Sequence, residues 1–523
     1  MKTLLKNGNI IDGTGAAAFV GDVLLDGDKI VSVGKSLEKP AGAKVVDCTG
    51  LCVAPGFIDA HSHNDFFVGK SEYFAPFVRQ GITTQITGNC GFSVFGIDKN
   101  SPHTEHVGGG LFKTEKPSGF TDFLKNTKGK LHLNVAPLIG HGTTRIATSG
   151  MESKPLSPTQ IDEMLLHVDE AMKNGALGGS LGLMYQPGLF SKKDELVAFA
   201  KKIKEYDGIL TVHPRACSKV APGYPLFSRK PHIEIALNEV AQIAKESGVR
   251  TQYSHLIHVG KATWKYCDRI LKKFNELKAQ GIDIGYDVYA YSFGTTILTV
   301  FLPAWYLSLP KKKKDKQITK SKIGTIINIT KLMLGFNFSD FMVAYISEEH
   351  KHYEGKTILE CAKMDGISDF DMYLKLVDLS EGKGRVLVSK YNNDEIIKKL
   401  MQDENSVFMT DAWLEETGFQ NAATFQCFPQ FLVTARDNNM QLEQIIHKMT
   451  GKTAARYQLE NRGVLKSGNF ADVTIFDCEN LKVNVAVPES APKGIKYVFI
   501  NGELVVDNDT YNPKTVGMHV LKN

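Results

Sequence analysis

The sequence lacks segments that would place the protein in a membrane or direct it through one. No run approaches the roughly 20 consecutive apolar residues that a membrane-spanning helix needs. The N-terminal stretch MKTLLKNGNIIDGTG has neither a long apolar core nor a small-residue cleavage pattern. We therefore predict no signal peptide, no membrane anchor and no membrane partner.

Cysteine and dense charge are also scarce. The 523 residues contain 8 scattered cysteines, which do not form a disulfide framework, so we expect the reducing cytoplasm as the location. The net charge is +5, and the one strong charge run, KKKKDK at 311–316, is typical of a solvated loop face. Without interleaved basic and aromatic residues, we expect no nucleic-acid partner. Homo-oligomerisation stays open.

Both ends of the chain have a sequence pattern that is typical of short strands joined by tight turns. Residues 1–54 place Asn-Gly and Asp-Gly between apolar runs, as β-hairpins do. The same pattern returns in ADVTIFD and GIKYVFINGELVVDN near the other end. We predict that residues 1–54 and 461–523 together form one small β-sandwich domain.

The middle of the chain, residues 55–460, alternates apolar strand-like runs with helical patterns such as HIEIALNEVAQIAKESG. This alternation is typical of βα units around a parallel sheet, and eight such strands predict an α/β fold, a (β/α)8 TIM-like barrel. The predicted strands are GFIDAHSH, GITTQITGNC, LNVAPLIGHG, GGSLGLMY, ILTVHPR, VRTQYSHLIH, IDIGYDVYAY and SVFMTDAWL.

Metal-binding residue types follow these strands. In PGFIDAHSHND, His61 and His63 project to the same side of an extended strand, about 7 Å apart along the backbone, and can chelate one ion. A single buried histidine is usually a satisfied core residue. A histidine, cysteine or aspartate ending strand after strand instead predicts a zinc cavity at the top of the barrel. The other residues in these positions are Cys90, His141, His213, His255 and Asp411.

The sequence resembles the amidohydrolase superfamily and, within it, the N-acyl-D-amino-acid deacylases, also called D-aminoacylases. The resemblance runs along nearly the whole chain, with interruptions, and GNCGFS is its most specific motif. The other matching pieces include APGFIDAHSHND, NVAPLIGHGTTR, SHLIHVGK, DVYAY and MTGKTAARYQLENRGVLKSGNFADVTIFD. Many amidohydrolases bridge two metals with a carboxylated lysine on the fourth strand, but GGSLGLMY contains no lysine.

The resemblance implies a ligand set and a catalytic residue. Cys90, His213 and His255 would hold a tightly bound zinc, and His61 and His63 would form a second, weaker site with Asp411. Asp411 would also act as general base and acid. Two plainer interpretations remain open: Cys90 as a small buried hydrophobe, and Asp411 as the N-cap of a helix.

The resemblance also implies substrate contacts. Tyr289 and Thr295 fall where the family places a tyrosine and a serine near the substrate, although Tyr289 can equally be a packed strand aromatic. His141 and Arg145 match a family motif and can contact substrate or support the structure.

The chain departs from the family in several places, among them the loop NAATFQCFPQFL after the eighth strand and the segment PRACSKVAPGYPLFSRKPH after His213. Ile257 stands where relatives carry a lysine two residues after the sixth-strand histidine, so we expect simple N-acetyl-D-amino acids to be poorer substrates here. Lys261 could supply the missing cation, as could His258, Arg215 or Arg229. An insertion at about 303–365 interrupts the spacing before the eighth strand and can be a lid or a surface insertion.

These features predict zinc-dependent hydrolysis of a linear amide in a small-molecule substrate, with an N-acyl-D-amino acid or a related N-acyl compound as the expected class. A cyclic amidohydrolase of the hydantoinase or dihydropyrimidinase kind is the alternative, and the missing lysine disfavours it. A catalytically inactive assembly protein is a third interpretation. Retention of all six metal and catalytic positions argues against that one.

Overall fold

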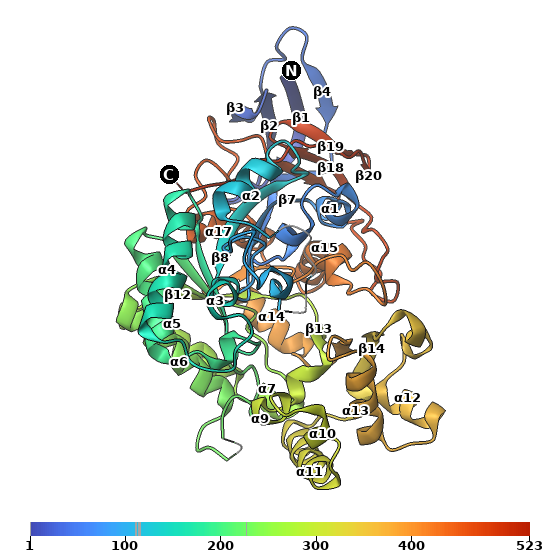
Figure 1. Ribbon diagram of the computed structural model, residues 1–523. Coiled ribbons are helices and arrows are strands. Elements are labelled where there is room, and N and C mark those ends of the chain that lie inside the picture. The colour runs from blue at the N-terminus through green and yellow to red at the C-terminus, as the bar shows by residue number, and fades with distance from the viewer. Residues whose placement is uncertain (1, 110–111, 113–116, 226, 523) are drawn as a thin grey trace.

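The computed structural model describes residues 2–109, 112, 117–225 and 227–522. Its centre is a barrel of eight parallel strands, in the order of the predicted strands along the chain (Figure 1). The barrel closes where the Ala60 N–H donates to the Phe408 carbonyl (3.1 Å) and Ser62 bridges Ala412. The strands are β6 (Phe57–Asp59), β7 (Ile82–Thr87), β8 (Asn134–Gly140), β9 (Gly178–Gly182), β10 (Ile209–His213), β11 (Arg250–Tyr253), β12 (Ile284–Val288) and β16 (Ser406–Phe408).

The strands of the barrel are buried on both faces, which explains why they appear as apolar runs rather than as alternating patterns. β9 is the exception in composition because it is rich in glycine. A Cβ atom added at Gly178 would lie 1.9 Å from the Ile209 carbonyl oxygen of the neighbouring strand β10. Glycine at this position therefore permits the close approach of β9 and β10.

Helices cover the outside of the barrel, and α4 to α6 stack along one side of it (Figure 1). The Ser157 hydroxyl accepts a hydrogen bond from the Gln160 N–H (3.3 Å) and fixes the start of α4. Among the described residues, every helix is too short or too polar to cross a bilayer. The main covering helices are α1 (Ser71–Val78), α2 (Phe120–Thr127), α3 (His141–Ser149), α4 (Pro158–Lys173), α5 (Lys193–Glu205), α6 (His232–Ser247), α8 (Cys267–Ala279), α14 (Asp394–Gln402), α15 (Ala423–Asp437), α16 (Leu442–Met449) and α17 (Gly451–Tyr457).

Strands from both chain ends form one further sheet, next to the barrel. Its order is β20-β19-β18-β17-β5-β1-β2-β3, with β4 paired to β1, and the two ends meet where β5 and β17 run antiparallel. This confirms that both ends build a small domain, while the limits 1–54, 55–460 and 461–523 stay predictions. The strands are β1 (Lys2–Ile10), β2 (Phe19–Asp26), β3 (Lys29–Gly34), β4 (Lys44–Asp47), β5 (Cys52–Pro55), β17 (Val473–Phe476), β18 (Ile495–Ile500), β19 (Glu503–Asp507) and β20 (Thr510–Tyr511).

The excursion before the last barrel strand has its own sheet and core. An antiparallel sheet of β13 (Gly294–Ile297), β15 (Arg385–Val388) and β14 (Phe341–Tyr345) extends beyond both ends of the predicted 303–365 insertion. Val343, Ile358 and Tyr373 belong to a buried cluster separate from the barrel core. We call residues 294–388 the insertion. Its helices are α9 (Ala304–Leu307), α10 (Lys311–Lys314), α11 (Gln317–Leu334), α12 (Ile358–Asp365) and α13 (Asp369–Leu379).

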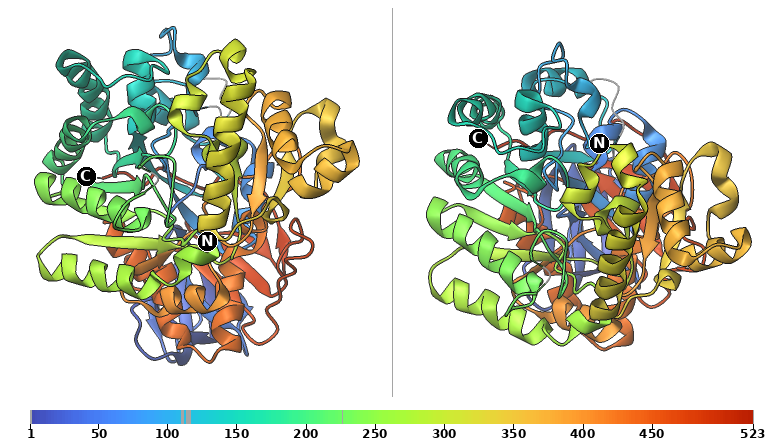
Figure 2. Two further views of the ribbon diagram at one scale, coloured as in Figure 1. Left: turned by 90° about the horizontal axis from the view of Figure 1, so that it is seen from below. Right: turned by 60° about the horizontal axis from the view of Figure 1, so that its bottom comes forward.

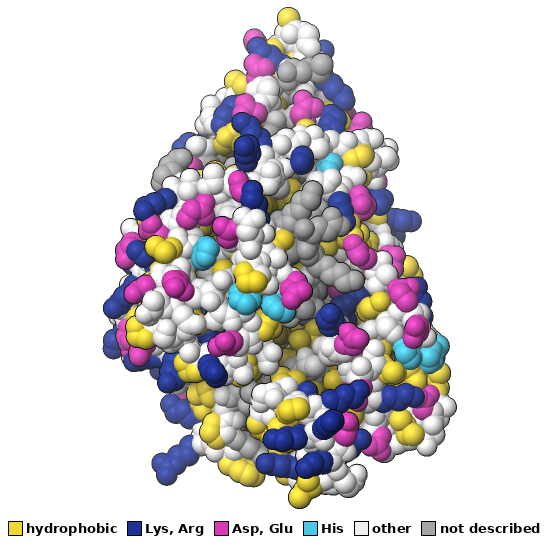
Figure 3. Space-filling model, viewed as in Figure 1, with side chains coloured by type: hydrophobic (Ala, Val, Ile, Leu, Met, Phe, Trp, Pro, Cys, Tyr) yellow, Lys and Arg dark blue, Asp and Glu magenta, His cyan; other side chains and the backbone are white. Residues whose placement is uncertain are grey.

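The insertion lies at the end of the molecule opposite the small sheet. Figure 2 views the protein from that end, with the yellow insertion helices in front of the barrel. Lysines gather over α10 and α11 in Figure 3, and Lys311, Lys312 and Lys313 are exposed there. The charge run is therefore on a solvated surface, while a role of the insertion as a lid stays a prediction.

Candidate metal centre and active site

The carboxyl ends of the barrel strands bring together the six residues that the sequence predicts as metal ligands. His61 and His63 follow β6, and Cys90 follows β7. The other three come from β10, β11 and β16: His213, His255 and Asp411. Two overlapping groups have their ligand atoms within 4.8 Å of one another, namely His61, His63, Cys90 and Asp411, and Cys90, His213 and His255.

The Cys90 thiol is the shared centre of these groups. Its Sγ lies 3.5 Å from His213 Nδ1 and 3.8 Å from His255 Nε2 on one side, and 3.3 Å from His61 Nε2 on the other. The two imidazole nitrogens of His213 and His255 are themselves 2.7 Å apart. Asp411 Oδ1 lies 3.3 Å from His61 Nε2 and 3.4 Å from His63 Nε2.

The backbone is strained at three of the six residues. Cys90, His255 and Asp411 adopt φ values of +52°, +36° and +46°, in the left-handed region that residues other than glycine rarely occupy. Each such conformation costs on the order of 1–3 kcal/mol and persists only where the surrounding structure enforces it. Here, the His255 N–H donates to Asp287 Oδ1 (2.5 Å) and the Asp411 N–H donates to the His61 carbonyl (3.0 Å). Such strain clusters at functional sites.

Burial controls the charge of the cluster. It holds the pKa of the His61 and His213 imidazoles well below the ordinary value, so both rings are neutral and each has a lone pair to donate. Burial also raises the pKa of the Cys90 thiol, which the carboxylates of Asp411 and Asp287 raise further. For Asp411, burial favours the neutral acid, but the hydrogen bond from His63, together with any proton on the neighbouring imidazoles, outweighs it and holds the pKa below the ordinary value.

These observations fit a bound zinc ion. Imidazole nitrogens, a sulfur and a carboxylate oxygen form the donor set that zinc prefers in proteins. The His213 and His255 nitrogens lie 2.7 Å apart, within hydrogen-bond distance, so one ring can donate a proton to the other. A cation bound by both nitrogens would take the place of that proton and keep the Cys90 sulfur as a thiolate.

Two buried aspartates that hold the ligands in place were missed by sequence reasoning. The Asp59 carboxylate accepts hydrogen bonds from the His61 N–H (3.2 Å) and the Thr410 N–H (2.9 Å), which links the first and last barrel strands. Burial raises the pKa of Asp59 to about 6. Asp287 supports His255 as described above. Both are acids inside apolar runs, FIDAH and GYDVYA, which is the signal that could have identified them.

Tyr289 and Thr295, which the sequence predicts to contact the substrate, are both hydrogen-bonded to Asn421. The Tyr289 hydroxyl donates to Asn421 Oδ1 (3.0 Å), and Asn421 Nδ2 donates to Thr295 Oγ1 (3.1 Å). Thr295 lines the pocket in front of the metal cluster, together with Asp411 and Cys90. Tyr289 is buried and is held behind this wall.

The structure does not bring His141 to the cluster. It lies fully buried with Arg145 against the Glu195 carboxylate: His141 Nε2 is 2.9 Å and Arg145 Nη1 is 2.6 Å from Glu195 Oε1. Burial would raise the pKa of Glu195, but these two partners outweigh it and lower the pKa to about 2. The trio is a buried ion-pair network beside the barrel strands.

The predicted replacement cations also lie away from the metal pocket. Lys261 begins α7 (Lys261–Trp264) and is exposed on the surface. His258 Nδ1 lies 3.1 Å from the Asn392 side-chain oxygen, and Arg215 pairs with Glu239 (3.1 Å). Arg229 is exposed on a loop.

A cation that the sequence did not reveal, Arg385, lines the metal pocket with Thr295, Asp411 and Trp413. It comes from β15 of the insertion, and its guanidinium lies 2.6 Å from the Glu415 carboxylate. Burial raises the pKa of Glu415 to about 7, against the opposing effect of Arg385. The pairing of β13 with β15 brings Arg385 to the metal pocket, and no local sequence pattern predicts this position.

Comparisons with known proteins bear on the family and the fold of the chain. The amidohydrolase family model matches residues 52–505. D-aminoacylase from Alcaligenes xylosoxydans xylosoxydans is 27% identical over 521 residues, which cover 98% of this chain and 96% of that protein. A crystal structure of D-aminoacylase superposes with a TM-score of 0.80 at 24% identity, covering 100% of this chain and 99% of that one. N-acyl-D-glutamate deacylase from Bordetella bronchiseptica, solved with zinc and a phosphonate inhibitor, gives a TM-score of 0.81 at 23% identity and 99% coverage of both chains. These two structures share the fold of a barrel with a small domain.

Proposed function

The chain belongs to the amidohydrolase family, and from that premise we propose that it is a zinc-dependent hydrolase of linear amides that deacylates an N-acyl-D-amino acid or a related N-acyl compound. The observation that carries the proposal is the convergence of Cys90, His213, His255 and Asp411 at the barrel mouth. A cysteine after the second strand takes the place of a bridging lysine on the fourth, since β9 contains none.

The ligands divide by chemistry into two sites. Cys90, His213 and His255 would hold the tight zinc, because a thiolate with two neutral imidazoles suits this metal. His61 and His63 with Asp411 would form the second, weaker site. When bound, zinc polarises a carbonyl and lowers the pKa of its water from 15.7 to about 7.

The side chains then handle the protons. The hydrogen bond from His63 favours the carboxylate form of Asp411, and the Asp411 side chain is 31% exposed toward the pocket. Its carboxylate can accept a proton from water and return it to the departing nitrogen, which would otherwise leave as a poor anion. The Thr295 hydroxyl, held by Asn421, lies in the pocket wall where it can orient the substrate.

Hydrolysis of a cyclic amide is the second candidate. The same barrel supports it, but the missing lysine on β9 disfavours a bridged two-metal site of that kind. An inactive assembly role is disfavoured because strained backbone persists at Cys90, His255 and Asp411, where a protein without activity would gain stability by relaxing it.

A substrate panel tests the proposal. Zinc-loaded protein is assayed with matched N-acyl-D-amino acids, N-acyl-L-amino acids, hydantoins and dihydropyrimidines. We expect release of free amine from the N-acyl-D compounds, with Asp411→Asn as the inactive control. Turnover of the cyclic compounds alone would support the second candidate instead.

A further inference from the structure

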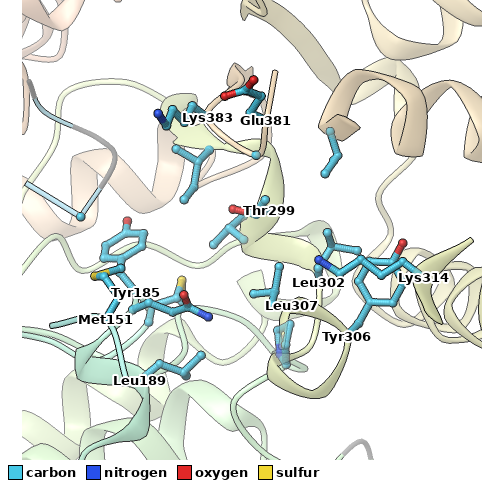
Figure 4. Close-up of a pocket in the computed structure, with 18 of the residues that line it drawn as sticks. Met151, Tyr185, Leu189, Thr299, Leu302, Tyr306, Leu307, Lys314, Glu381 and Lys383 are labelled. Atoms are coloured by element: carbon cyan, nitrogen blue, oxygen red, sulfur yellow. The ribbon is translucent and has the colours of Figure 1, made fainter. Parts of the chain in front are cut away.

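A cleft of about 520 Å³ separates the barrel loops from the insertion. In Figure 4, Met151, Tyr185 and Leu189 on the barrel side lie across from Leu302 and Leu307 of the insertion. The volume lies within the roughly 300–1,000 Å³ of sites that bind small organic molecules. Aliphatic side chains form much of the wall. Charged side chains also line it: the buried Arg215, which is paired with Glu239, and several on the insertion, among them Lys314, Glu381 and Lys383.

A smaller cavity of about 80 Å³ shares lining residues with this cleft and with the metal pocket. Met184, Tyr185, Pro222 and Val300 line both the cleft and the cavity. Tyr185, His213 and Thr296 line both the cavity and the metal pocket. The shared residues place this cavity next to both the metal pocket and the cleft.

The connecting cavity is uncharged. Ile257, Val220, Val300 and Leu334 form much of its wall, and none of the described residues that line it is an aspartate, glutamate, lysine or arginine. Burying a carboxylate there without a partner would be strongly unfavourable. An uncharged branch of a substrate therefore suits this cavity, and its aliphatic side chains favour an apolar one.

The metal pocket has a charged side chain, Arg385, on a part of its wall that the connecting cavity does not share. Arg385 and Trp413 line that pocket and are absent from the walls of the connecting cavity. An N-acyl-amino acid has one branch that carries a carboxylate and one acyl branch that carries no charge. Arg385 suits the first branch, and the cavity at Ile257 suits the second.

We propose that the substrate carries a long aliphatic acyl chain, which runs from the metal centre past Ile257 and Val300 into the cleft under the insertion. This inference rests on the proposed function and specifies its substrate class. Water adds across the scissile amide: the C–N bond breaks, the hydroxyl goes to the carbonyl carbon, and the proton goes to the nitrogen. The products are a fatty acid and a free amine.

Acyl-chain length gives the first test. A ladder of N-acyl-D-alanines from acetyl through octanoyl to dodecanoyl keeps the amine small and constant. We expect kcat/KM to rise by about fourfold per methylene over the first several, the equivalent of roughly 0.8 kcal/mol per buried CH₂. If kcat/KM is measurable but does not change with acyl-chain length, the inference is overturned and the proposed function stands. The same holds if the preference depends only on the side chain of the amine.

Binding without catalysis gives the second test. Dodecanoic acid and acetate are titrated into zinc-loaded protein by calorimetry, and we expect dodecanoic acid to bind at least tenfold more tightly. Val300→Asp places a charge in both the cavity and the cleft and should abolish this difference, whereas Val20→Asp, at a position 67% exposed on the small sheet, should not.

The two tests separate the two proposals. Equal binding of acetate and dodecanoic acid, or a Val300→Asp variant that still prefers the long chain, would overturn the cleft as the acyl site. Failure to hydrolyse any N-acyl amide would instead overturn the proposed function.

Discussion

The barrel mouth and the insertion face each other across the same opening but are built on different principles. At the barrel mouth, polar atoms follow parallel strands, and backbone hydrogen bonds hold the strained residues His255 and Asp411. The insertion packs around its own apolar cluster. It contributes aliphatic side chains and several charged ones, such as Lys314 and Glu381, to the cleft, and Arg385 to the metal pocket. The comparison indicates that the barrel supplies chemistry and the insertion supplies selectivity, and four variants test it.

The largest effect is expected from Cys90→Ala. Cys90 belongs to both ligand groups, so its loss should remove the tight zinc and with it the activity. Alanine keeps the strained backbone almost as unfavourable as before, so the fold should change little. Zinc content by mass spectrometry and circular dichroism measure the two properties.

Cys267→Ala is the matched control for this variant, because Cys267 is also buried but lies on α8, outside the metal cluster. It should keep its zinc. Undiminished zinc in Cys90→Ala would refute the ligand assignment.

Asp411→Asn should lower kcat by roughly 10²- to 10⁴-fold, the range typical of a lost general acid-base group. The amide keeps the shape of the side chain but cannot take up the proton from water. The tight zinc should remain, because its ligands Cys90, His213 and His255 are untouched. Normal turnover would mean that another group moves the proton.

Glu195→Gln should leave the chemistry intact and weaken the barrel. It removes the carboxylate that pairs with the fully buried Arg145, and breaking a buried pair in this way costs about 3–5 kcal/mol. Urea denaturation measures the loss. Because the partners of Glu195 lower its pKa to about 2, their stabilisation is present near neutrality and is lost as the pH falls toward 2.

Glu246→Gln is the matched control for stability, since Glu246 forms a surface pair with Lys193 (3.0 Å). It should cost less than about 1 kcal/mol. If Glu195→Gln instead lost activity without losing stability, His141 and its partners would belong to the substrate site, as the sequence resemblance implies.

The smallest effect is expected from Ile257→Lys, which places a cation in the uncharged cavity. Since we assign this cavity to the acyl branch, a buried ammonium there should lower the preference for long acyl chains. If the carboxylate branch occupied the cavity instead, a charge-assisted contact of roughly 1.5–3 kcal/mol would improve the use of short N-acyl-D-amino acids by about tenfold or more. Kinetics with matched free acids and their uncharged amides distinguish the two outcomes, and an unchanged profile would show that the side chain at 257 does not contact the substrate.

The sequence predicts most of what lies at the barrel mouth because the pattern there is local. Each strand is a short apolar run, and the ligand follows at the end of that run, as in PGFIDAHSHND. A local pattern cannot predict the position of a residue that is fixed by contacts with distant parts of the chain. Arg385 reaches the pocket only because β15 pairs with β13, about 90 positions earlier.

Sequence spacing also misplaces two residues. His141 ends its strand as the ligands do, yet its ring is held by Glu195 on the neighbouring α5. Lys261 lies four residues from Ile257, but α7 begins there and leaves the lysine exposed. In both cases the direction of the side chain depends on packing between elements, which a linear pattern does not encode.

The pairing of β5 with β17 has a consequence for synthesis on the ribosome. Pro55 faces Val473 in this ladder, and at the usual 5–20 residues per second the intervening roughly 420 residues take about 20–80 s to emerge. For that time the inner edge of the N-terminal strands is without its partner, and unpaired strand edges are prone to aggregation. A chaperone that shields the nascent N-terminal sheet should therefore raise the yield of folded protein more than one that acts only after release.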